Sequence, residues 1–275
     1  MTVKLIANEN GGYTITQVLV HPVVYLDHWA VRLFSDEIPL QNRFVTALHR
    51  SRGTWVFSTA NLMEFTAMTD LAQAAKGEAL LLRAIPHINF ADTTLDRGYY
   101  FEEGAEPHPD APEQDWVLRD LEGRAKIIGG KWNTHRFLQD AIHHKSELEP
   151  LFADMKQSVS DAVMALTKDN QRHEAAKKFT PTPGMTLRHA FNGELLREPH
   201  INPEYVFNIN DAVDYIHASS GGIIGDLILL DAGWSHKVEQ AKRRLRKGGV
   251  KGHLAVSFSK RTVTDFLTAL ESWQG

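Results

Sequence analysis

Four acidic residues stand where a short apolar run meets a turn or a helix: Asp27, Glu64, Asp214 and Asp231. Residues 23–26 (Val-Val-Tyr-Leu) and 227–230 (Leu-Ile-Leu-Leu) directly precede two of them, and Trp-Val-Phe at 55–57 precedes the segment that carries Glu64. The carboxyl ends of parallel strands meet at one edge of a sheet, so these carboxylates would gather there. Gathered carboxylates repel one another and usually hold hard divalent cations such as Mg²⁺ or Mn²⁺. The sequence therefore predicts metal-dependent phosphodiester chemistry.

A second pattern surrounds Asp214. Residues three apart share a helix face, so Asp211, Asp214 and His217 form one stripe. Asp211 is an additional candidate metal ligand, or it caps the helix, where acids complement the helix dipole. His217 could hydrogen-bond a carboxylate or a scissile phosphate, or it could be a structural residue of the helix.

Phosphodiester hydrolysis needs a deprotonated water, a polarised phosphorus and a stabilised leaving oxyanion. Two divalent ions about 4 Å apart supply all three, and acidic side chains fix the positions of the ions. We expect Asp27, Glu64 and Asp214 to bind metal directly. Asp231 is expected to be a catalytic ligand or to act through a metal-bound water.

Basic residues follow the last acid within one predicted helix. Lys242, Arg243 and Arg244 belong to a run from Lys237 to Lys251 that contains a single acid, Glu239. Such a helix beside a metal cluster could bind a phosphate backbone, and a solvated helix face is the alternative. A third group could bind a transition metal at helical spacing, although a solvated surface is the preferred interpretation: Asp140, His143, His144 and Glu147.

Composition narrows the function classes. The chain has 275 residues, 43% hydrophobic and 23% charged, with a net charge of −4 and no cysteine. These values are typical of a soluble globular protein, and they exclude disulfides and zinc-thiolate sites. The beginning of the chain does not resemble a signal peptide, and no apolar stretch reaches the roughly 18 residues of a membrane span. We therefore expect a cytoplasmic protein with no membrane association.

The hydrophobic period predicts alternating strands and helices. Strands are expected at 23–26, 54–58, 226–230 and 253–258. Helices are expected at 28–34, 40–50, 60–69, 71–84, 203–220, 235–247 and 261–273. Two glycine pairs, 221–222 and 248–249, are read as helix C-caps. This alternation is typical of a parallel sheet with helices on both faces.

The pattern changes in the middle of the chain. Residues 102–115 are acidic and rich in proline, which predicts an exposed loop. Residues 133–149 and 151–178 have the pattern of two long amphipathic helices separated by Pro150. We expect an α/β core formed by 1–92 and 203–275, with 93–202 as a helical insertion or cap.

The order of the acids resembles that of the PIN-domain nucleases. In that family an Asp ends the first strand, a Glu lies on an early helix, a later helix carries an Asp, and a final acid closes the fourth strand. The matching segments here are 24–27, 58–65, 210–218 and 226–231. Two features depart from the family: Leu229 stands where a small hydroxylated residue is frequent, and the middle block lengthens the chain.

The resemblance implies a PIN-like three-layer α/β/α fold and a Mg²⁺- or Mn²⁺-dependent endonuclease, acting on single-stranded RNA. A role as a toxin or defence ribonuclease is compatible with it. Two alternatives stay open: a catalytically inactive PIN-like scaffold that binds nucleic acid or protein, and a structure-specific DNA nuclease. The sequence also leaves open whether an inhibitory protein or a second copy of the chain is a partner.

Overall fold

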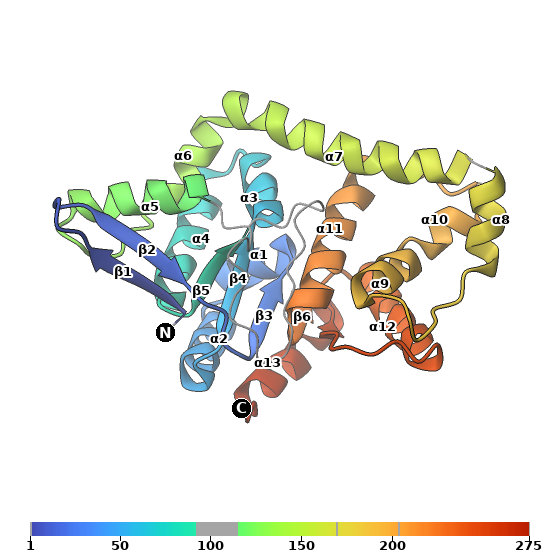
Figure 1. Ribbon diagram of the computed structural model, residues 1–275. Coiled ribbons are helices and arrows are strands. Elements are labelled where there is room, and N and C mark those ends of the chain that lie inside the picture. Colours follow the sequence, from blue (N-terminus) through green and yellow to red (C-terminus); the bar gives the residue numbers. More distant parts are fainter. Residues whose placement is uncertain (1, 92–114, 169, 203, 275) are drawn as a thin grey trace.

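A five-stranded parallel sheet lies at the centre of the molecule and is flanked by helices (Figure 1). The computed structural model describes residues 2–91, 115–168, 170–202 and 204–274. The strand order is β5-β4-β3-β6-β7. The strands are β3 (Val23–Leu26), β4 (Thr54–Ser58), β5 (Ile88–Ala91), β6 (Leu227–Leu229) and β7 (Val256–Phe258). The predicted α/β class with a parallel sheet is confirmed.

Seven helices connect or follow these strands, close to where the sequence predicts them. They are α1 (His28–Asp36), α2 (Ile38–Ser51), α3 (Thr59–Thr66), α4 (Leu71–Ala84), α11 (Ile209–Ile224), α12 (Ala232–Lys247) and α13 (Val263–Glu271). A 3-10 turn, η1 (Lys260–Thr262), lies between β7 and α13. None of the helices in the described residues is both long and apolar enough to span a bilayer.

The central strand β3 fixes the geometry of the sheet. All four of its side chains are buried, as expected for a parallel strand covered on both faces. Tyr25 is in register with Val56 of β4 and with Ile228 of β6. The residues that follow β3, β4 and β6 are therefore brought to the same edge of the sheet.

Helix α11 differs from its prediction at both ends. It begins at Ile209 rather than at 203, because Asn208 accepts hydrogen bonds from the first-turn amides and forms a capping box with Asp211. It also continues through Gly221 and Gly222, so the prediction that this pair is a C-cap is wrong. A Cβ at Gly221 would lie 2.8 Å from Tyr25 Cδ1, so the glycine lets the helix approach β3 closely.

The middle block also differs from its prediction. Pro150 lies inside α7 (Lys145–Lys168) and does not end a helix. It stands in the second turn, where a proline removes one backbone hydrogen bond and leaves the later turns intact. The other helices of this block are α5 (Asp115–Ile127), α6 (Phe137–His143), α8 (Asn170–Lys178), α9 (Leu187–Leu195) and α10 (Arg197–Ile201). The predicted loop at 102–115 lies almost entirely outside the described residues.

The middle block shares its hydrophobic core with the sheet and the surrounding helices. Leu138 of α6 and Phe191 of α9 are fully buried and belong to the same cluster as the β3 side chains. Helix α7 contacts α3 and α11, and it runs above both along the top of Figure 1. The block therefore packs on the elements that carry the acidic residues.

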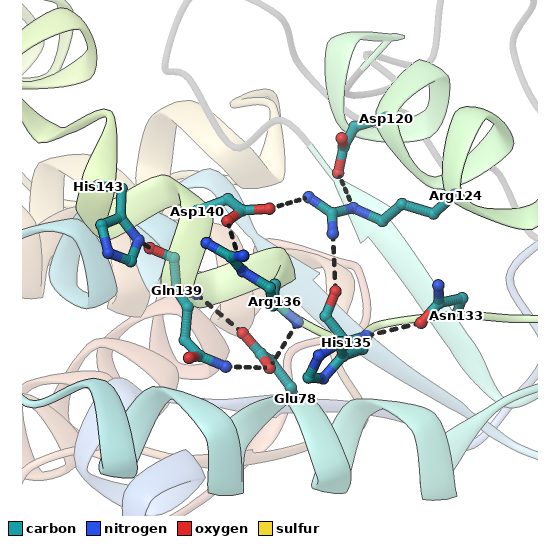
Figure 2. Close-up of polar contacts among 9 residues, drawn as sticks. All are labelled: Glu78, Asp120, Arg124, Asn133, His135, Arg136, Gln139, Asp140 and His143. Carbon is teal, nitrogen blue, oxygen red and sulfur yellow. Dashed lines mark hydrogen bonds and ion pairs between the residues drawn. The ribbon is translucent and has the colours of Figure 1, made fainter. Parts of the chain in front are cut away.

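Polar contacts join α6 to α4 as well (Figure 2). The buried Glu78 carboxylate of α4 accepts hydrogen bonds from the backbone amides of Arg136 and Gln139, at 2.9 and 2.8 Å, and from the Gln139 side chain. Arg124 of α5 contacts Asp140 of α6 at 2.9 Å. These bonds satisfy free amides at the α6 N-terminus, where negative charge is also favourable.

A hairpin that the sequence did not reveal lies beside β5. It consists of β1 (Val3–Ala7) and β2 (Tyr13–Gln17). The side-chain amide of Gln17 donates to the backbone carbonyl of Phe90 at 3.1 Å, and its oxygen accepts from the backbone amide of Phe90 at 2.7 Å. This side chain pairs with the backbone of an edge strand that would otherwise present free polar groups.

Candidate functional site

Two of the predicted acids lie at the carboxyl edge of the sheet, on neighbouring strands. Asp27 follows β3 and its amide donates to the Leu229 carbonyl of β6 at 2.9 Å. Asp231 follows β6, and its carboxylate caps α12 by accepting from the Trp234 amide at 2.9 Å. The Asp231 amide donates to the Asp27 carboxylate at 3.3 Å. The parallel register alone thus places these two acids together.

Two helices supply the other acids. Glu64 lies on α3, which starts at a Ser58 capping box directly after β4, and Asp214 lies in the second turn of α11. One ligand atom from each of Asp27, Asp214 and Asp231 lies within 4.8 Å of the other two. The same holds for Asp27, Glu64 and His217. The structure brings the four predicted acids together, and Asp27 belongs to both groups.

His217 is the fully buried polar centre of the cluster. Its Nε2 lies 2.7 Å from the Glu64 carboxylate and 3.9 Å from that of Asp27. On its other side Nδ1 lies 2.7 Å from the Tyr25 hydroxyl, which in turn lies 2.8 Å from the Ser58 hydroxyl. Each imidazole nitrogen is therefore hydrogen-bonded to a side chain of a different element, Glu64 of α3 and Tyr25 of β3.

The charge state of His217 follows from its neighbours. Burial would lower its pKa, but the carboxylates of Glu64 and Asp27 outweigh burial and raise the pKa to about 9. The side chain is therefore an imidazolium at neutral pH, and both of its nitrogens donate hydrogen bonds. In this state it has no lone pair for a metal, and its positive charge offsets the negative charge of the carboxylates.

Two of the acids hold their protons unusually tightly. Burial is the main cause that raises the pKa of Asp27 to about 6, and the charges of Glu64 and Asp231 add to it. Burial and the charges of Asp231 and Asp27 raise the pKa of Asp214 to about 7. Glu64 is different: burial opposes its ionisation, but His217 overcomes this and lowers its pKa. Without a cation, the cluster concentrates more negative charge than its surroundings stabilise.

The donor set fits a divalent cation. Asp27, Asp214 and Asp231 offer carboxylate oxygens, the ligands that hard cations prefer, at a separation that one ion can bridge. A bound cation would favour the ionised forms of Asp27 and Asp214, whose pKa values are raised in its absence. The cluster could therefore hold a metal ion.

A pocket of about 510 Å³ opens onto this cluster. Asp27, Glu64, Asp214 and Asp231 all line it, and so do side chains that the sequence analysis did not single out for this role: His28, Trp29, Arg32, Leu33, Asp36 and Lys260. Arg32 lies on α1, just past Asp27, and Lys260 follows the end of β7. Their places after strands at the carboxyl edge were the available signal in the sequence.

Other predicted residues lie elsewhere. The Asp211 carboxylate accepts from the Asn208 amide at 3.0 Å and belongs to the α11 cap. Arg243 is twelve residues beyond Asp231, about 18 Å along α12, and does not line the pocket. Lys242 is buried and donates to the Ala255 carbonyl at 2.7 Å.

Arg244 is also used within the protein, because it contacts the buried Glu194 carboxylate at 3.0 Å. Arg243 is exposed. The structure therefore does not bring Lys242, Arg243 or Arg244 to the acidic cluster.

The surface group on α6 and α7 forms local contacts. Asp140 pairs with Arg124 at 2.9 Å, His143 contacts the Gln139 carbonyl of its own helix at 2.8 Å, and His144 contacts Glu147 at 3.0 Å. Among the residues that the structure describes, these four do not form a group that could bind one ion. This agrees with their interpretation as a solvated surface.

Comparison of the chain with protein-family models, with curated proteins and with solved structures gives no match.

Proposed function

We propose that the chain is a Mg²⁺- or Mn²⁺-dependent endonuclease. The observation that carries the proposal is the convergence of ligand atoms from Asp27, Asp214 and Asp231 within 4.8 Å of one another in the lining of a pocket. The acids also lie on the elements that the PIN-domain resemblance implies: the end of the first parallel strand, an early helix, a later helix and the end of the fourth parallel strand. A PIN-like fold is part of this proposal.

Each side chain has a distinct role in the proposed reaction. Asp27, Asp214 and Asp231 would hold a divalent cation, which when bound would supply a nucleophilic water and neutralise the developing charge. Glu64 is the fourth acid of the cluster. Its carboxylate and that of Asp27 face the same nitrogen of His217, at 2.7 and 3.9 Å. His217 touches no pocket solvent and acts as a positioning residue, because its hydrogen bonds to Glu64 and Tyr25 fix the direction of both side chains.

Single-stranded RNA is the proposed substrate, and this choice rests on the resemblance. A toxin or defence ribonuclease is the matching biological role, held in check by an inhibitory protein. The alternatives are a structure-specific DNA nuclease and a catalytically inactive scaffold. The raised pKa values of Asp27 and Asp214 favour a metal site over an inactive scaffold, since burying repelling acids without a cation destabilises the fold.

The test is Mn²⁺-dependent cleavage of single-stranded RNA, single-stranded DNA and flapped duplex by the full chain. The Asp27→Asn/Asp214→Asn variant should be inactive, and Asp265→Asn, an exposed acid on α13, should cleave like the wild type. Cleavage by the wild type alone supports the nuclease and ranks its substrates. Equal cleavage by the double variant would remove these acids from the site. Absence of both cleavage and calorimetric Mn²⁺ binding in the wild type would instead support the scaffold.

A further inference from the structure

Two cationic side chains share the pocket with the acids. Arg32 and Lys260 are both exposed, and neither makes an ion pair with any residue in the described parts of the chain. The pocket acid Asp36, in contrast, is paired with Lys76 at 2.7 Å. Arg32 and Lys260 thus keep their positive charges unpaired, although carboxylates line the same pocket.

A third group in the pocket lacks a partner. His28 is only 9% exposed, and its Nδ1 is buried without a hydrogen bond to any described residue. The indole N–H of the neighbouring Trp29 is also buried without a hydrogen bond to any described residue. A buried polar atom without a partner is costly to the fold, so a site that leaves one beside a pocket is suited to a ligand that supplies the missing hydrogen bond.

The elements explain why these groups lie together. His28 and Arg32 are four residues apart on α1 and therefore share a helix face. The helix starts directly after Asp27, so this face borders the acidic cluster. Lys260 reaches the same pocket from η1, after β7. The pocket therefore combines oxygen ligands for a cation with donors for an anion.

We propose that Arg32, Lys260 and His28 form a phosphate-binding wall that holds a single nucleic-acid strand, with one phosphodiester between this wall and the acidic cluster. The proposal rests on the proposed nuclease function and assigns the residues that hold its substrate. Arg binds phosphate oxygens through two parallel hydrogen bonds, and Lys binds them as a point charge. Arg32 and Lys260 therefore offset the repulsion that the acids exert on an approaching polyanion.

The size of the pocket suits a short piece of one strand. A volume of about 510 Å³ is that of a site for a small molecule, so it admits a short piece of one strand. We therefore expect the site to bind a single strand more tightly than a base-paired duplex. The partly buried Trp29 lines the same pocket and offers an aromatic surface for a base.

The experiment measures binding of a single-stranded 12-mer to the full chain by fluorescence anisotropy. Ca²⁺ is used in place of the Mn²⁺ of the cleavage assay, so that binding is measured with a hard cation present. Arg32→Gln and Lys260→Gln should each raise the Kd about tenfold and lower the slope of log Kd against log salt by about one. The matched control is Arg261→Gln, the exposed neighbour of Lys260 that does not line the pocket, which should leave both values unchanged.

Three results would overturn the inference. Unchanged affinity and salt slope in both variants would remove the phosphate-binding wall. A blunt duplex that binds as tightly as the single strand would exclude the pocket as the strand site. A nucleoside monophosphate that binds as tightly as the 12-mer would identify a free nucleotide as the ligand.

Calorimetry with Mn²⁺ separates this inference from the nuclease proposal. Both Gln variants should bind Mn²⁺ like the wild type, because neither residue is a proposed metal ligand. Mn²⁺ binding with an unaffected 12-mer Kd contradicts the phosphate-binding wall alone. A wild type that binds the 12-mer through Arg32 and Lys260 but binds no Mn²⁺ contradicts the nuclease alone.

Discussion

His217 and Glu64 form a 2.7 Å ion pair in which the imidazolium is fully buried and the carboxylate keeps partial contact with the pocket. The pair places one positive charge among the acids at this sheet edge. Both nitrogens of His217 donate, one to Glu64 and one to the Tyr25 hydroxyl, so the charge is compensated and the ring is fixed. The same imidazolium also faces Asp27, at 3.9 Å.

Replacement of this histidine should destabilise the protein. In His217→Gln the Glu64 carboxylate loses its partner, which costs about 3–5 kcal/mol for a fully buried pair. We expect about 2–3 kcal/mol, because solvent reaches part of Glu64. Urea unfolding in EDTA measures the loss, and His236→Gln, an exposed histidine on α12, is the control. Equal stability of the two variants would show that His217 does not compensate the acids.

The metal-free protein should lose stability as the pH rises. Asp27 and Asp214 have folded-state pKa values of about 6 and about 7, above their ordinary value of 3.8. The folded state therefore binds more protons than the unfolded state between about pH 4 and pH 7, and stability falls across that range. His217, raised from 6.5 to about 9, adds stability that is complete below pH 6.5 and is lost as the pH passes 9.

The Asp214→Asn variant tests this assignment. It should flatten the decline between pH 4 and pH 7 and raise the Tm at pH 7, with about 2 °C gained per kcal/mol of relieved repulsion. Thermal melts in EDTA across pH 4–9 give the two curves, with Asp265→Asn as the control. The wild type in Mn²⁺ should lose the decline, since a bound cation favours the ionised acids. Parallel curves for Asp214→Asn and wild type in EDTA would contradict the raised pKa of Asp214.

The sequence predicted four of the five parallel strands and missed β5 (Ile88–Ala91). Strands β3 and β6 are continuous apolar runs, the pattern expected of strands that are buried on both faces of a sheet. Gly221 and Gly222 misled the prediction because their reason is tertiary: the close approach of Tyr25 and Phe191 to α11 has no local signature. The hairpin β1–β2 was missed because most of its side chains are at least partly exposed, so it has no continuous apolar run.

The acidic cluster was predictable, and the rest of the pocket was not. Asp27 and Asp231 follow from strand ends alone, since parallel register brings such positions together. Arg32 and Lys260 both follow strands at this edge, but only the folded chain shows that both line one pocket. The basic run on α12 was the more visible signal, but Lys242 is buried beneath it.

Arg243 tests how far a bound strand extends. This exposed residue lies about 18 Å along α12 from Asp231. Arg243→Glu should therefore raise the Kd for a single-stranded 12-mer by about threefold or less, while Lys260→Glu should raise it more than tenfold. Arg244 is unsuitable for this test, because its loss would leave the buried Glu194 without one of its cations. A larger effect at Arg243 than at Lys260 would place the main phosphate contacts on α12.

The middle block should prove necessary for folding. A chain lacking residues 95–198 would expose the surfaces that now cover Leu138 and Phe191, both fully buried in the common core. We expect an insoluble product or one without a cooperative melt. A matched pair of substitutions gives a gentler measure: Leu138→Ala should cost about 2–5 kcal/mol, and Leu151→Ala, 66% exposed on α7, almost nothing. A soluble deletion product that unfolds cooperatively would show that 1–92 and 203–275 contain a complete core, and that 93–202 is an insertion upon it.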